Sequence, residues 1–183
     1  RRDEDLDNLH SIYVDQWDWE KIILRPQRTL EQLEETVRLI VRSLKETDEV
    51  LCANVPQITP IIEEKVKFIT AQELLDRYPS LTAKQREDAV TKEYGTVFIE
   101  QIGGLLSNGQ PHDGRAPDYD DWQLNGDLLI WDAVLNRAME ISSMGIRVDE
   151  ASMIDQLNKA GCPERSVLPF HRALLAGDLP LTM

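Results

Sequence analysis

Cysteine and long hydrophobic runs are both scarce in this sequence. Its 183 residues include two cysteines, Cys52 and Cys162, which are far apart and form no CxxC pair. A disulfide framework or a zinc site is therefore not expected, and a reduced, cytosolic protein fits this usage best. No run approaches the ~18 apolar residues that a membrane-spanning helix needs, and the start does not have the pattern of a signal peptide.

Positive charge is also in short supply. Lys and Arg number 20 against 33 Asp and Glu, which gives a formal net charge of −13. This balance argues against binding to nucleic acid or to anionic membranes, because both need a basic surface. It leaves room for a small anionic ligand that is held by one or two arginines. The sequence also has no Walker P-loop, GxSxG, HExxH or GxGxxG motif.

The length suffices for one domain with a core of its own. Without an internal repeat or a linker-like stretch, we expect residues 1–183 to form a single domain. The chain starts at Arg1 without Met and ends at Met183 without a polar tail, so we expect it to be a segment of a longer polypeptide.

Periodicity and capping residues predict an α+β fold with a mainly antiparallel sheet. Capping-box pairs at Thr29, Thr70 and Thr82, each with Glu or Gln three residues on, predict helix starts. Helices are expected at about 30–47, 71–78, 83–93, 150–160 and 164–176; strands at 11–20, 65–70, 96–102 and 127–131; and a glycine- and proline-containing loop at 107–126. Residues 138–148 read equally well as a strand or as the end of a helix.

The first candidate site is the run Arg1-Arg2-Asp3-Glu4-Asp5. An arginine fork donates two hydrogen bonds at once and therefore suits a phosphate group, and acidic neighbours can hold it in place. The alternative is a solvated charge run.

The second candidate is Gln16 with Asp18, which share one face of the strand expected at 11–20. A carboxylate beside an amide can bind an α-amino group, because the acid pairs with the ammonium and the amide fixes its direction. An edge strand with a wet face is the alternative reading.

The third candidate combines Asp118, Asp120 and Asp121 with His112 and Arg115 just upstream. Clustered carboxylates on a loop can hold a hard cation, either directly or through water. A solvated turn explains them equally well. His112 alone is weak support for catalysis, and the other two histidines are expected to cap or to pack.

The fourth candidate pairs Asp127 with Glu140. If the two segments are neighbouring antiparallel strands, the two carboxylates can meet on one face. Mg²⁺ takes one or two carboxylates together with phosphate oxygens, so this pair would suffice for a nucleotide-metal site. Arg147 could then pair with an anionic substrate. A helix with surface charges is the alternative.

Long motifs carry a resemblance that these patterns alone do not. They are the Arg-Asp-Glu-Asp opening with His10–Glu20, Gly103–Trp122, Leu124–Asp127, Ser142–Asp149 and Leu174–Thr182. Together they closely resemble the bacterial ammonia-dependent asparagine synthetases (aspartate–ammonia ligases) over essentially the whole chain.

The resemblance implies the core fold of class II aminoacyl-tRNA synthetases, with parts of that fold missing at both ends. It implies an enzyme of asparagine biosynthesis that converts ATP, L-aspartate and ammonia to L-asparagine, AMP and pyrophosphate through a β-aspartyl-adenylate. ATP and Mg²⁺ are the implied cofactors, and the family's homodimer is the implied assembly. Free ammonia is expected as the donor, because no glutaminase-like nucleophile is evident.

The resemblance also assigns roles to residues. Arg1, Asp120 and Arg147 are the implied catalytic residues, with Asp120 receiving ammonia. The implied substrate-binding residues are Gln16, Asp18, Ser142 and Ser143. The implied nucleotide-binding residues are Arg2, Ser11, Val14, Arg115, Asp127 and Glu140, of which Asp127 and Glu140 also hold the metal.

Two other readings remain beside an active ligase. The chain could be a catalytically inactive fragment that serves as an interaction module. A synthetase that acts on tRNA is disfavoured, because the net charge is −13 and no anticodon-binding module is present.

Overall fold

A four-stranded sheet in the order β1-β2-β3-β4 forms the middle layer of the protein. A computed structural model describes residues 12–13, 15 and 18–183. The strands are β1 (Lys67–Thr70), β2 (Thr96–Glu100), β3 (Asp120–Asp132) and β4 (Arg137–Arg147). β1 runs parallel to β2, whereas β2–β3 and β3–β4 are antiparallel. The expected mainly antiparallel α+β sheet is therefore confirmed.

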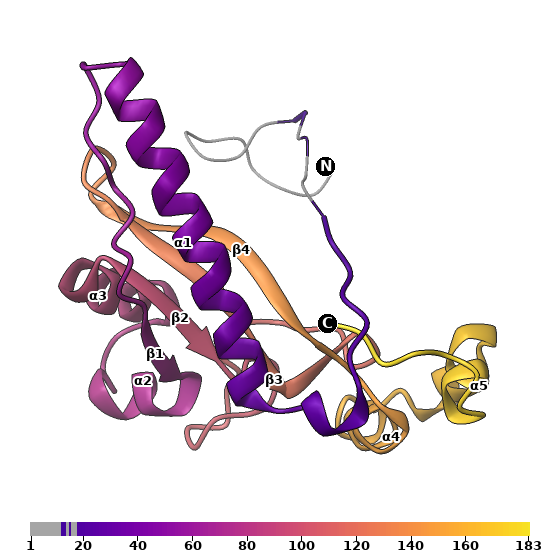
Figure 1. Ribbon diagram of the computed structural model, residues 1–183. Coiled ribbons are helices and arrows are strands. Elements are labelled where there is room, and N and C mark those ends of the chain that lie inside the picture. Colours follow the sequence, from indigo (N-terminus) through magenta and orange to yellow (C-terminus); the bar gives the residue numbers. More distant parts are fainter. Residues whose placement is uncertain (1–11, 14, 16–17) are drawn as a thin grey trace.

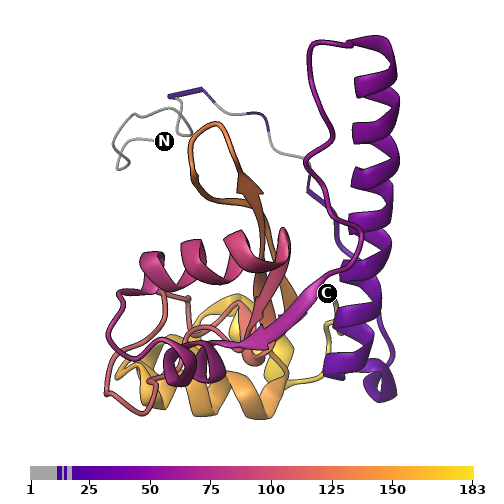
Figure 2. The ribbon, with the colours of Figure 1, turned by 90° about the vertical axis from the view of Figure 1, so that its left-hand side faces the viewer.

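The long helix α1 (Leu30–Asn54) covers one face of this sheet (Figures 1 and 2). The side chain of Thr29 caps its first turn by accepting a hydrogen bond from the N–H of Gln32. Leu33, Val37 and Val41 recur at helical spacing and pack against Phe98, Leu128, Ile130, Met144 and Ile146 of the sheet. The helix continues to Asn54 instead of ending near residue 47 as expected.

The opposite face is covered in part by α2 (Ala71–Arg77) and α3 (Ala83–Tyr94), as Figure 2 shows. Both helices begin with the capping boxes that the sequence predicts, at Thr70 and at Thr82. α3 ends at Gly95, whose φ of 79° is a conformation that favours glycine. Their apolar residues pack on the β1–β2 half of the sheet and at Leu129.

The part of the chain that follows β4 forms a smaller helical unit beside the start of β3 and the end of β4 (Figure 1). It contains α4 (Glu150–Lys159), the 3-10 turn η2 (Pro163–Val167) and α5 (Pro169–Leu175). One continuous helix was expected at 164–176. It is interrupted because Leu168 precedes Pro169 and takes an extended conformation, with ψ of 151°.

The start of β3 corrects one expectation from sequence. Residues 107–126 were expected to form a loop, yet β3 already begins at Asp120. Gly126, the last residue of the expected loop, is a strand residue that lies close to β2. A Cβ there would lie 2.4 Å from the carbonyl oxygen of Ile99 and 2.6 Å from the ring of Phe98. β4 resolves the other ambiguity, since residues 138–148 lie almost wholly in a strand.

The strand expected at residues 11–20 is not found in its described part. Residues 12, 13, 15 and 18–20 have no strand assignment, and the other four residues of that range lie outside the description. Regular pairing begins just after it, where Ile22 bridges Thr182 in antiparallel fashion. The N–H of Arg147 also donates to the carbonyl of Thr182. This pairing brings Glu20 next to the end of β4.

Within the described residues, none of the helices has the length and hydropathy that a membrane-spanning segment needs.

Candidate active site

A row of polar side chains, which we call the polar strip, runs along β3 and β4 on the face that carries α2 and α3. Asp127 stands opposite Ser143 and beside Ile99, and the side chain of Ile99 packs on this face. Because side chains alternate along a strand, Gly145 and Arg147 share that face with Ser143. The polar strip consists of Asp120, Asp127, Glu140, Ser143 and Arg147 on the strands, together with Arg115 from the loop before β3 and Glu20.

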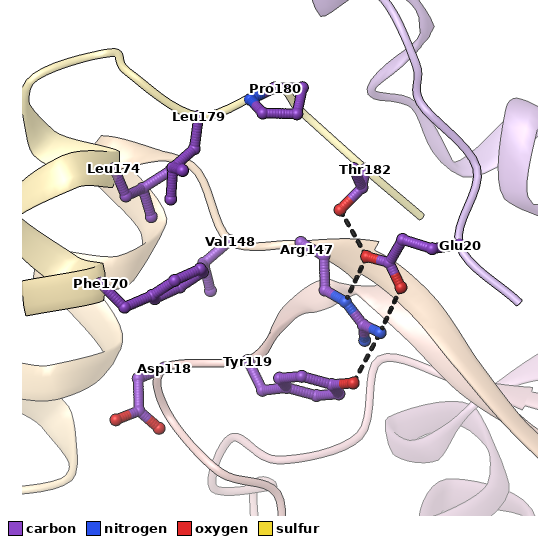
Figure 3. Close-up of a pocket in the computed structure, with 10 residues that line it drawn as sticks. All are labelled: Glu20, Asp118, Tyr119, Arg147, Val148, Phe170, Leu174, Leu179, Pro180 and Thr182. Atoms are coloured by element: carbon purple, nitrogen blue, oxygen red, sulfur yellow. Dashed lines mark hydrogen bonds and ion pairs between the residues drawn. The ribbon is translucent and has the colours of Figure 1, made fainter. Parts of the chain in front are cut away.

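One end of the polar strip is centred on the guanidinium of Arg147 (Figure 3). Its Nη1 lies 2.5 Å from Oδ1 of Asp120, and its Nε and Nη2 donate to Glu20 at 3.2 and 3.0 Å. Nη2 also donates to the hydroxyl of Tyr119 at 2.7 Å, and the guanidinium lies over that ring. One cation is therefore shared between two carboxylates and an aromatic ring.

Burial and ion pairing act in opposite directions on these two carboxylates. Burial raises the pKa of Asp120 above its ordinary value, although the charge of Arg147 works against this. Burial also opposes ionisation of Glu20, but hydrogen bonds from Arg147 and Thr182 outweigh it and lower the pKa of Glu20. Glu20 is thus held ionised against Arg147.

The middle of the polar strip is the ion pair between Arg115 and Asp127. Asp127 is 5% exposed and is also hydrogen-bonded to the side chain of Ser143. Burial raises its pKa, and the positive charge of Arg115 opposes that rise. The charge of Arg115 also opposes the rise in the pKa of Asp120, so Arg115 acts on both carboxylates that β3 contributes to the polar strip.

Glu140 lies at the other end, on the same face as Asp127. The register pairs Leu129 with Glu140, and Leu129 is two residues from Asp127. One side of Glu140 reaches solvent, but the protein around the rest of its carboxyl group raises its pKa to about 7, and the nearby charge of Asp127 adds to the rise. The expectation that Asp127 and Glu140 meet across neighbouring strands is confirmed.

Lys84 and Glu87 on α3 extend the polar strip behind Glu140. Glu87 is buried, lies 3.0 Å from the ammonium of Lys84 and is hydrogen-bonded to Nε2 of His112 at 3.1 Å. Lys84 and Glu87 both act electrostatically on Glu140. Their place could not be read from the sequence, because it depends on how α3 packs on β4.

The residues present fit a magnesium ion at Asp127 and Glu140. Their two carboxyl groups are close enough for Asp127 to raise the pKa of Glu140, and hard oxygen ligands are the ones that Mg²⁺ prefers. The described residues hold no group of three or more His, Cys, Asp or Glu that could bind a metal alone. Phosphate oxygens or water would complete the coordination, as is usual for nucleotide-bound Mg²⁺.

The acidic run at the start of β3 does not gather around a cation, so that expectation is wrong. Asp118 pairs with His171 at 3.1 Å and with Arg165 at 3.2 Å. Asp120 and Asp121 pair with two different arginines, Arg147 and Arg28. Each carboxylate therefore has its own partner, and Asp120 and Asp121, as neighbouring strand residues, point to opposite sides. The packing role expected for His171 is confirmed.

Among the described residues, two others expected from sequence, Ser142 and Asp18, have no described contact with the polar strip. Ser142 stands opposite Leu128, whose side chain packs under α1, so Ser142 points to the other face. Asp18 is exposed, and its carboxylate accepts a hydrogen bond from the N–H of Trp19 at 2.9 Å. Arg1, Arg2, Ser11, Val14 and Gln16 lie outside the described residues.

Glu20 is a site residue that sequence reasoning missed. Two-residue alternation from Gln16 and Asp18 reaches it, and it is the residue of that segment that contacts Arg147. The alternation was therefore a usable signal, even though its described part forms no strand.

A pocket of about 290 Å³ opens beside the Arg147 end of the polar strip (Figure 3). Its lining residues are Glu20, Asp118, Tyr119, Arg147, Val148, Phe170, Leu174, Leu179, Pro180 and Thr182. One end is thus charged, whereas the helical unit supplies apolar walls. Such a pocket can seat a small ligand that is polar at one end.

Comparison with solved structures defines the fold class. The chain aligns with Entamoeba histolytica asparaginyl-tRNA synthetase, solved in complex with asparaginyl-adenylate, with a TM-score of 0.53 and 15% identity. The match covers 89% of this chain and 39% of the synthetase. The sheet and its helices therefore form the core of the class II aminoacyl-tRNA synthetase fold.

Sequence comparison then defines the family. The family model for aspartate–ammonia ligase matches residues 1–183. Aspartate–ammonia ligases of Clostridium perfringens (strain ATCC 13124) and Lactobacillus johnsonii are 59% identical over 183 residues and 57% identical over 184 residues. Each match covers 100% of this chain, and 54% and 55% of the relative, respectively. The chain belongs to the aspartate–ammonia ligase family and spans about half the length of these relatives.

Proposed function

We propose that the polypeptide carrying this chain joins ammonia to L-aspartate with ATP, releasing L-asparagine, AMP and pyrophosphate. The observation that carries this proposal is the polar strip. It gathers two arginines and four carboxylates along one sheet face, beside a pocket, in a member of the aspartate–ammonia ligase family. Seating an anionic amino acid against a nucleotide requires fixed charges of both signs.

The first step activates aspartate. An oxygen of its β-carboxylate attacks the α-phosphorus of ATP, the bond to pyrophosphate breaks, and a β-aspartyl-adenylate forms. Arg115 would bind the nucleotide phosphate through its guanidinium, which Asp127 holds in place by an ion pair. Asp127 and Glu140 would hold Mg²⁺, which, when bound, neutralises phosphate charge.

The second step releases AMP. Ammonia attacks the acyl carbon, the bond to the phosphate oxygen breaks, and a proton is lost from nitrogen. Asp120 would attract ammonium and take up a proton, a role consistent with its buried carboxyl group. Arg147 would bind the α-carboxylate of aspartate in the position that Glu20 occupies in this structure. Ser143 would orient the same substrate.

The remaining assignments rest on the family resemblance. Arg1, or Arg2 if the motif is set one residue later, would steady the carboxylate and the α-phosphate. Gln16 and Asp18 would bind the aspartate ammonium and fix its direction. Ser11 and Val14 would lie near the adenylate, and Ser142 would complete the pocket. A homodimer, a cytoplasmic location and the absence of nucleic-acid and membrane partners belong to the same proposal.

The longest open reading frame that contains this sequence provides the test. The purified product should form AMP, and not ADP, only when ATP, aspartate and ammonia are all present. With aspartate labelled by ¹⁸O in its β-carboxylate, one labelled oxygen should appear in AMP. Formation of ADP, or of unlabelled AMP, would contradict the adenylate route.

A second function is favoured by the length comparison. Because the chain spans about half of its relatives, residues 1–183 alone would act as an inactive binding module. We expect them to form no AMP in the same assay. Robust turnover by the 183-residue chain would show that the rest of the relatives' length is dispensable.

A further inference from the structure

The pairing of β3 with β4 breaks next to the Arg147 end of the polar strip. Asp120 pairs with Arg147, but the next pair is Asn125 with Gly145. Residues 121–124 of β3 therefore stand against Ile146 alone. An irregularity of this kind removes ladder hydrogen bonds and re-aims side chains. The ion pair between Asp120 and Arg147 therefore lies at the edge of a stretch without regular pairing, where contacts from other groups add to its support.

Arg28, which precedes α1, fills this break with its guanidinium. Its side chain is 12% exposed, and its Nη2 lies 2.5 Å from Oδ2 of Asp121, whose side chain is 7% exposed. The same nitrogen donates to the carbonyl of Arg147 at 3.3 Å and to the hydroxyl of Ser152 at 3.0 Å. Nη1 lies 3.5 Å from Asp149, which caps α4. One side chain thus joins β3, β4 and α4.

A residue of α4 also contacts the backbone of β3 at this break. Gln156 is 3% exposed, accepts a hydrogen bond from the N–H of Trp122 and donates to the carbonyl of Asp120. These contacts fix the backbone of β3. Of the contacts that Arg28 and Gln156 make at the break, the hydrogen bond from Arg28 to the carbonyl of Arg147 reaches β4.

Arg25, one turn earlier, provides an internal comparison. It pairs with Glu150 at 2.9 Å and approaches Asp149 at 4.0 Å, so it also contacts α4. Its side chain is 63% exposed and has no described contact with β3 or β4. Exposed pairs of this kind contribute little. The two arginines therefore share a segment and a partner helix but differ in their relation to the polar strip.

We propose that Arg28 is a positioning residue that holds Arg147 and Asp120 in register across the break in the β3–β4 ladder. Its catalytic consequence rests on the proposed function, because Arg147 and Asp120 are there assigned to aspartate and ammonia. Its positioning role does not, since it concerns the backbone of this chain alone. Small displacements of a binding group lower rates strongly. Loss of Arg28 should therefore change the kinetics with respect to aspartate more than those with respect to ATP.

The test variant must avoid a trivial loss of folding. Removing Arg28 alone would leave Asp121 as a buried charge without its partner, which is strongly destabilising. Arg28→Met combined with Asp121→Asn removes the pair without leaving a charge, and Arg25→Ala is the matched control. All variants are made in the longest reading frame that contains this sequence.

Hydrogen exchange tests positioning without any activity measurement. In the double variant, the amides of Arg147 and Val148, which bond to Thr182 and Tyr119, should exchange at least about tenfold faster, whereas amides in α1 keep their rates. Arg25→Ala should leave all of these rates unchanged. Wild-type rates at residues 147 and 148 in the double variant would overturn the proposal.

Kinetics test the consequence. We expect the double variant to raise the KM for aspartate by about tenfold to a hundredfold and to leave the KM for ATP within about twofold. In an Arg147→Met background the same double change should alter the KM for aspartate by less than about twofold, because Arg28 acts through Arg147. An unchanged aspartate KM, or a full effect in that background, would overturn the proposal. If the wild-type protein does not use aspartate at all, the proposed function fails, and hydrogen exchange still decides the role of Arg28.

Discussion

The two faces of the sheet are built from the same strands, yet they are covered very differently. Toward α1, β3 and β4 present Leu128, Ile130, Met144 and Ile146, all at most 5% exposed. Toward α2 and α3, the same two strands present Asp127, Ser143 and Arg147 beside the buried Leu129. Because side chains alternate along a strand, residues that stabilise the core and residues of the polar strip are neighbours in the sequence. Substitutions on the α1 face should therefore lower the free energy of unfolding, whereas substitutions on the polar face should lower activity and leave stability intact.

The largest expected effect is on the α1 face. Phe98 is fully buried between the sheet and α1. Phe98→Ala should lower the free energy of unfolding by about 3–5 kcal/mol, because it leaves a cavity as well as losing buried surface. Urea unfolding followed by circular dichroism measures this. A loss below about 1 kcal/mol would mean that this face is not the main core.

The next effect is on the polar face and should leave stability intact. Glu140→Gln removes the repulsion between Glu140 and Asp127, so the unfolding free energy should not fall. AMP formation should fall about a hundredfold or more, because a charged group at the transferred phosphate is lost. Glu46→Gln, an exposed change on α1, is the matched control with no effect on either measurement. Full activity of Glu140→Gln would separate the polar strip from the reaction.

Glu100 is a buried acidic residue that lies outside the polar strip, and it should make the stability of the protein depend on pH. It is 4% exposed at the end of β2, its Oε1 has no partner among the described residues, and burial followed by the charges of Glu34 and Glu73 raises its pKa to about 7. The unfolded chain ionises at its ordinary value of 4.5. Protonated Glu100 therefore favours the folded state below that pH, and this contribution is lost as the pH rises through about 7.

Glu100→Gln should remove this pH dependence. At pH 8 we expect the variant to be more stable than wild type by about 2 kcal/mol, and near pH 4 the difference should vanish. Unfolding free energies at both pH values check this, with Glu49→Gln on the exposed side of α1 as a control. A variant equally stable at pH 8 would show that Glu100 ionises as it does in water.

The smallest effect concerns the local signal that positions α3. The hydroxyl of Thr82 accepts a hydrogen bond from the N–H of Gln85, and Gln85 caps the N–H of Thr82 in return. Thr82→Ala should lower the unfolding free energy by about 1 kcal/mol. Thr82→Ser should restore it, since serine caps equally well. Loss of activity beyond the loss of stability would mean that α3 acts on the polar strip through Lys84.

Local signals were the part of the fold that the sequence could predict. Capping boxes at Thr70 and Thr82 located α2 and α3, because a cap satisfies its own helix whatever packs around it. The expected start of β3 at residue 127 is too late, because the glycines and prolines of residues 107–126 indicate a loop that extends to Gly126. Position 126 is a glycine because Ile99 and Phe98 approach its backbone closely. This is a long-range contact that no local sequence pattern encodes.

The candidate site divides in the same way. Asp127 and Glu140 could be paired in advance, since antiparallel neighbours bring alternate residues to one face. Arg115 was singled out next to the acidic run, but its partner Asp127 depends on how the loop folds back. Glu87 and Arg28 carried no signal at all. Each is placed by a helix or turn that packs on residues more than twenty positions away.

Carboxyl footprinting of the full reading frame tests the central claim most directly, because it reports which face binds the substrates. Carbodiimide labelling of Glu140, which is exposed, should fall when aspartate and Mg-ATP are added, whereas labelling of Glu35 and Glu46 on α1 should stay constant. Unchanged labelling of Glu140, with protection on α1 instead, would place the ligands on the opposite face and contradict this account.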